Sequence, residues 1–142
     1  MAKTDVAVGD VFAIPLVGGG FGVGRIVHIA DRWRLAQFFR VRLNKPVFFE
    51  ELIHLPDVMP VHNVVTSLIE DGSWPVMQRR SLDGLPDLDS LVFYRGLADS
   101  RSYVSLKNEA VEGSPEWSAS TMPQFAEFIA SQLDNSLRRA GC

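Results

Sequence analysis

Apolar and polar residues alternate along the first part of the chain, which is the pattern of β-strands. The first two such stretches cover residues 11–16 and 21–29, and the glycines at 18–20 separate them. This arrangement predicts a β-hairpin. Pro15 has no N–H to donate to a sheet, so we expect an edge strand or a bulge at that position.

A third strand is expected over residues 33–43, where Phe38 and Phe39 place one ring on each face. Such a pair indicates a sheet that is covered on both sides. Residues 47–55 fit a short helix as well as a strand, and both interpretations stay open. Beyond them we expect a polar loop over residues 81–90 and further short strands at 61–69, 74–77, 91–94 and 102–106.

The C-terminal segment has the periodicity of an amphipathic helix. Thr121 and Gln124 form a capping-box pattern, with Thr121 as the N-cap and Pro123 in the first turn. Apolar residues at helical spacing then predict one continuous buried stripe: Phe125, Phe128, Ile129, Leu133 and Leu137.

These elements predict one α+β domain, mainly β, over residues 1–142. We expect a strongly bent antiparallel sheet or a partly open barrel, with the C-terminal helix packed on it. A hydrophobic content of 46% supports a folded core of this kind.

Charge is unevenly divided along the chain, whose net charge is −3. Residues 1–49 hold seven Lys and Arg against three Asp, whereas residues 50–142 hold seven against fourteen Asp and Glu. The only cysteine is Cys142, so no intrachain disulfide can form. The N-terminal residues lack an apolar run of the secretory type, and we expect a cytoplasmic protein that does not enter membranes.

Motifs for catalysis or cofactor binding are weak. The glycine-rich segment 18–24 is followed by a strand-like pattern rather than by the helix that a phosphate-binding loop requires. The three histidines, His28, His54 and His62, are far apart in the sequence, and a zinc site needs three or four converging ligands. We therefore expect no enzyme activity, no cofactor and no metal site.

A group of arginines with interleaved aromatic residues allows one alternative function. Arg32, Arg34, Arg40 and Arg42 lie close together in the sequence with Phe38 among them. Small β-barrels bind single-stranded nucleic acid with such a face. The protein is acidic overall, with a pI of about 5.5, so pairing of these arginines with the acidic C-terminal part is favoured.

Two blocks of sequence resemble the immunity-protein family numbered twenty-six in bacterial polymorphic toxin systems. The first block spans residues 8–16 and 21–27, and the second spans 71–77, with Gly, Trp and Pro in the family's order. The residues that match the family's motifs are Gly9, Asp10, Pro15, Gly24, Arg25, Trp74 and Pro75.

The resemblance implies a protein that binds and neutralises a cognate protein toxin. It implies turns or strand geometry for Gly9, Pro15 and Gly24, a core position for Trp74, and a structural pair of Arg25 with Asp10. An acidic surface would suit a basic toxin such as a nuclease-type domain. We expect the partner at exposed acidic positions, namely Glu50, Glu51, Asp57, Asp83, Asp87 and Asp89.

Overall fold

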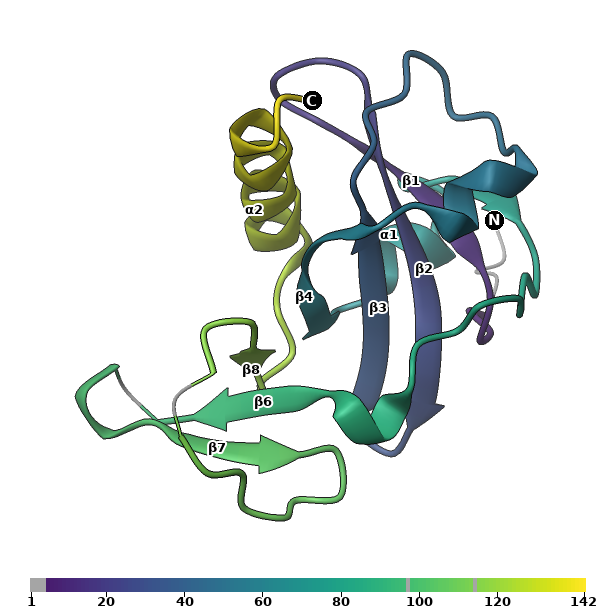
Figure 1. Ribbon diagram of the computed structural model, residues 1–142. Coiled ribbons are helices and arrows are strands. Elements are labelled where there is room, and N and C mark those ends of the chain that lie inside the picture. Colours follow the sequence, from purple (N-terminus) through teal and green to yellow (C-terminus); the bar gives the residue numbers. More distant parts are fainter. Residues whose placement is uncertain (1–4, 97, 114) are drawn as a thin grey trace.

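The computed structural model describes residues 5–96, 98–113 and 115–142 (Figure 1). Residues 1–4, 97 and 114 belong to the expected 1–142 domain but lie outside the described residues. The larger of two sheets is antiparallel and has the strand order β4-β3-β2-β1-β5. Its strands are β1 (Val11–Pro15), β2 (Phe21–Ala30), β3 (Trp33–Phe39), β4 (Asp57–Asn63) and β5 (Val76–Gln78).

A smaller sheet follows in the sequence and lies below the first in Figure 1. Its order is β7-β6-β8, with β6 antiparallel to β7 and parallel to β8. The strands are β6 (Val92–Arg95), β7 (Ser102–Ser105) and β8 (Ala119–Ser120). The helical elements are η1 (Glu50–His54), α1 (Ser67–Glu70), η2 (Leu88–Ser90), η3 (Ala98–Ser100) and α2 (Ala126–Arg139).

The expected fold class is confirmed: the described structure is mainly β, with open sheets and one C-terminal helix, α2. Helix α2 stands beside the larger sheet (Figure 1) and packs on one of its faces. Alternation along the strands turns Ile26 and Phe38 toward α2. The buried side chains of this core include Phe12, Ile14, Ile26, Phe38, Met59, Trp74, Ile129, Leu133 and Leu137.

The opposite face of the larger sheet is also covered. Phe39 packs with Leu52 and Ile53 of η1. Farther along, Val27, Leu35 and Val61 pack against Phe93 and against leucines of the long connection between β5 and β6. Phe38 and Phe39 are both fully buried, one in each core, which confirms the prediction of a sheet covered on two sides.

β3 and β4 differ most from the strands expected from the sequence, whereas β5 and β6 are shifted by one or two residues. β3 ends at Phe39, because the N–H of Val41 bonds to the Phe39 carbonyl and turns the chain out of the sheet. The strand expected over 61–69 instead covers Asp57–Asn63, and the chain then forms the short helix α1. Pro60 lies within β4, which is an edge strand, where proline is tolerated. The ambiguous segment 47–55 contains the 3₁₀ helix η1.

Helix α2 begins later than predicted, with Phe125 rather than Thr121 at the N-cap. Gln124 is held to the end of β4, because its N–H bonds to Asn63 and its carbonyl accepts from Val65. Residues 121–124 therefore cannot form a first helical turn. Phe125 and Phe128, expected in the buried stripe, are 71% and 44% exposed. β8 was not expected from the sequence.

The residues that match the family motifs lie at positions where they support the fold. Gly9 has a positive φ of 91°, and a side chain on Gly24 would come within 2.5 Å of the Phe12 ring. Trp74 is 5% exposed and stacks on Phe12. The carbonyl of Pro75 accepts from the N–H of Ala13.

Pro15 does not mark an edge strand, since β1 lies between β2 and β5. β5 pairs only with Val11 and Phe12, so no strand of this sheet needs an N–H from Pro15 on that side. The described helices include none that is long and apolar enough to cross a lipid bilayer.

Candidate functional site

The six predicted acidic residues lie on or beside the two segments that cover the sheet face opposite α2. Glu50 and Glu51 are exposed on η1. Asp83 is exposed on the connection between β5 and β6, and Asp57 is half-buried at the start of β4. Asp87 and Asp89 lie on or next to η2 farther along that connection, and both are exposed.

A buried arginine holds the backbone of the segment that carries Asp83. Arg25 is fully buried in β2, between Val23 and Val27 on the same face. Its Nη1 donates to the carbonyls of Ser81 (3.1 Å) and Asp83 (2.6 Å), and its Nη2 donates to the carbonyl of Gly84 (3.2 Å). One guanidinium thus holds three neighbouring positions of an otherwise irregular segment.

The same arginine begins a polar chain across three strands. Its Nε donates to Gln37 on β3 (2.8 Å), and the Gln37 amide donates to Asp57 on β4 (3.0 Å). Burial lowers the pKa of Arg25 against the opposing effect of Asp57 and Asp83. Burial raises the pKa of Asp57, although the Gln37 hydrogen bond and Arg25 oppose this shift. Asp57 is therefore part of the supporting network rather than a free surface charge.

Arg25 does not pair with Asp10, which corrects the pairing expected from the resemblance. Within the described residues, Asp10 instead forms an ion pair with Arg79 at 2.7 Å and accepts from the N–H groups of Ala7 and Arg80. The reason is geometric. Asp10 lies in the turn before β1, whereas the side chain of Arg25 extends under the segment 81–84.

The structure brings Glu50, His54 and Asp83 together, with one potential ligand atom of each within 4.8 Å of the others. This contact was not expected from the sequence. The three side chains are exposed, and exposed acidic groups often come this close without a cation. Chemically, the group is a concentration of negative charge with an imidazole beside it.

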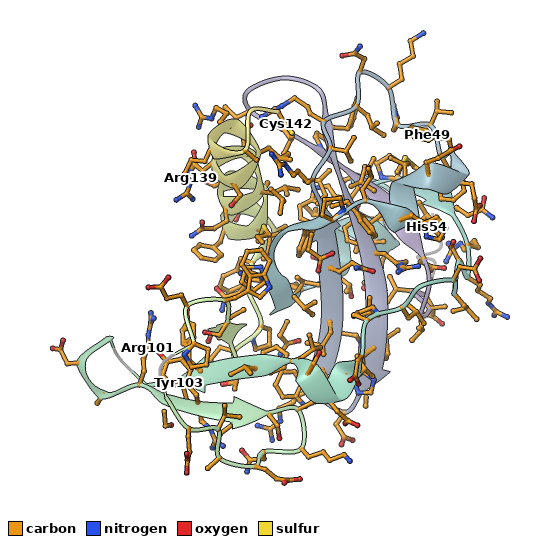
Figure 2. All side chains as sticks on the ribbon, in the orientation of Figure 1. Phe49, His54, Arg101, Tyr103, Arg139 and Cys142 are labelled. Atoms are coloured by element: carbon orange, nitrogen blue, oxygen red, sulfur yellow. The ribbon has the colours of Figure 1, made fainter. Side chains whose placement is uncertain are left out.

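Large apolar side chains adjoin this charge. Phe49 immediately precedes Glu50 and is 45% exposed, and Leu82 immediately precedes Asp83 and is 56% exposed. Figure 2 shows Phe49 and His54 on the same side of the molecule. We call Phe49, Glu50, Glu51, Leu82 and Asp83 the acidic face. Sequence reasoning found its carboxylates but missed its two apolar residues.

Asp87 and Asp89 have local roles. The Asp87 carboxylate accepts from the N–H of Asp89 and caps η2. Asp89 lies 3.9 Å from the ammonium of Lys107, which is in the turn after β7.

The arginines of the alternative hypothesis do not share an open strand face. Arg42 pairs with Asp134 of α2 at 2.7 Å, and Arg40 donates to the carbonyl of Ala140. Arg34 donates to carbonyls of its own turn. Phe38 is fully buried and in this conformation has no free face on which a base could stack.

Comparison with family models, with curated proteins and with solved structures gave no match to this chain.

Proposed function

We propose that this chain is a cytoplasmic binding protein that neutralises a cognate protein toxin, without catalysis of its own. The proposal rests on the two sequence blocks that resemble the immunity-protein family. The structural observation that supports it best is the acidic face, where the exposed side chains of Phe49 and Leu82 adjoin the carboxylates of Glu50 and Asp83.

Tight inhibition of a toxin needs a surface that is already in its bound shape and carries a few strong anchors. Aromatic residues surrounded by charge are typical of such anchors, and Phe49 has that position next to Glu50 and Glu51. The buried Arg25 holds the backbone of residues 81–84, which reduces the loss of conformational entropy on binding. The carboxylates favour a toxin domain with a basic surface, such as a nuclease-type domain.

The test is rescue of growth. The proposal expects a toxin with a toxic C-terminal domain in a neighbouring gene, and that domain is expressed alone, with the wild-type chain, and with the variant Phe49→Ala. We expect growth only with the wild-type chain, together with a stable complex of the two proteins on size-exclusion chromatography.

The matched control is Trp117→Ala, which removes an exposed aromatic residue on another part of the surface. This control should rescue growth like the wild type. Absence of both rescue and complex formation with the wild-type chain would contradict the proposed function. Full rescue by Phe49→Ala would contradict the location of the surface.

A further inference from the structure

A groove of about 560 Å³ lies along the outer side of β4, apart from the acidic face. Its floor includes Val58 and His62 of β4. One wall is α2, with Phe128 and Gln132, and the other is the segment 116–120, which includes β8. The volume is within the usual range of small-molecule sites in proteins.

On the floor of the groove, Nε2 of His62 is a polar atom to which the described part of the chain gives no hydrogen-bond partner. His62 is only 9% exposed, and its Nδ1 lies 2.6 Å from the carbonyl oxygen of Pro60. A carbonyl oxygen can only accept, so Nδ1 carries the proton and Nε2 carries a lone pair. Burial lowers the pKa of His62, against the opposing hydrogen bond to Pro60, which favours this neutral ring.

His62 lines the groove. Among the described residues, no hydrogen bond to its Nε2 is found. No buried side-chain nitrogen or oxygen of the described residues lacks a partner, so Nε2 keeps solvent contact. The groove is where the side chain of His62 reaches solvent. The result is an oriented hydrogen-bond acceptor at the base of a cavity.

The walls supply aromatic surface and little charge. Trp117 on one wall is 56% exposed, and Phe128 on the other is 44% exposed. Of the lining residues only Glu116 and Arg139 have side chains that are charged at neutral pH, and the other polar side-chain groups are amides, hydroxyls, the indole N–H of Trp117 and His62. An anion without a proton cannot donate to Nε2, whereas an uncharged ring with an N–H or O–H group satisfies both the acceptor and the aromatic walls.

We propose that this groove binds a small uncharged aromatic molecule that bears an N–H or O–H donor. The donor bonds to Nε2 of His62, and the ring packs against Trp117 and Phe128. The site is separate from the acidic face and does not depend on the proposed toxin partner.

Two pairs of probes test this assignment: indole with 1-methylindole, and phenol with anisole. Members of a pair have similar shape, but the methylated member cannot donate a hydrogen bond. Affinities are measured by NMR titration of the full chain. We expect each donor to bind about fivefold more tightly than its methylated partner, which corresponds to one net hydrogen bond.

The variant His62→Phe should bring the two affinities in each pair to within about twofold, and Trp117→Ala should weaken all four probes. The matched control His54→Phe, beside the acidic face, should behave as the wild type. Equal affinities within each pair for the wild type, or a preference that survives in His62→Phe, would overturn the proposal.

A second measurement uses the wild-type chain, so it tests the proposal even if His62→Phe does not fold. In the wild type, the ¹⁵N resonance of His62 Nε2 should move on addition of indole and not on addition of 1-methylindole. An unchanged Nε2 resonance at saturating indole would also overturn the proposal.

Discussion

The guanidinium of Arg25 lies in the middle of a sheet face whose neighbouring side chains, Val23 and Val27, are apolar. That position is visible in the sequence as a charged residue on an apolar face of a strand. Its partners are not visible, because three of them are backbone carbonyls more than fifty positions away. The sequence therefore predicts a partner for Arg25 but not which one, and the resemblance suggested Asp10 incorrectly.

Replacement of Arg25 by lysine should destabilise the protein by about 2–4 kcal/mol. Lysine keeps the charge but cannot reach Gln37 and three carbonyls at once, so buried acceptors lose their donors. Urea unfolding of Arg25→Lys measures the loss. The exposed Arg32→Lys is the matched control and should stay within about 0.5 kcal/mol of the wild type. Equal stability of the two variants would contradict the structural role of Arg25.

Protonation of His62 should destabilise the folded state. Its pKa is lowered in the fold below the ordinary value of 6.5, so the unfolded chain binds a proton more readily. The contribution is fully present above pH 6.5 and declines as pH falls below that value toward the lowered pKa. Urea unfolding between pH 7.5 and about pH 5 should show this decline, and His62→Gln should reduce it. An unchanged pH dependence in the variant would contradict the assignment.

At the scale of elements, the sequence predicted helices and strands correctly where the spacing of apolar residues matches the buried positions. The prediction failed where backbone hydrogen bonds to distant segments set the boundary of an element. The first hairpin and the buried stripe of α2 at Ile129, Leu133 and Leu137 follow from spacing alone. The start of α2 does not, because the backbone of Gln124 bonds to the end of β4, and no local pattern shows that contact. Pro60 is not typical of a strand interior, yet it lies within β4, because an edge strand accepts proline.

The late start of α2 leaves a helix without a side-chain cap, since Phe125 at the N-cap accepts no N–H. Phe125→Ser should therefore stabilise the protein by about 0.5–1 kcal/mol. The measurement is the urea midpoint at unchanged m-value. Phe128→Ser is the matched control, because it removes another exposed phenylalanine inside the helix and should give no gain. A gain in both variants, or in neither, would contradict the observed start of the helix.

At the scale of the whole molecule, ion pairs between the basic and the acidic part of the chain neutralise only some of their opposite charges. Arg42 of the basic part pairs with Asp134 of the acidic part, as the sequence favoured. Glu50 and Asp83 come together across more than thirty positions and add their charge at one place. Composition predicted a charged surface, but Phe49 and Leu82 could not be assigned to it, because exposure of an apolar side chain depends on tertiary packing.

The most direct test of the proposed toxin-binding surface is the dissociation constant of the complex with the toxin domain that the proposal expects in a neighbouring gene. The double variant Glu50→Lys/Glu51→Lys reverses charge on the acidic face. The matched control Glu109→Lys/Glu112→Lys makes the same change at two exposed positions elsewhere. We predict weakening of about tenfold to a hundredfold for the first variant, smaller at high salt, and a change within about threefold for the control. Wild-type affinity of Glu50→Lys/Glu51→Lys would contradict the assignment.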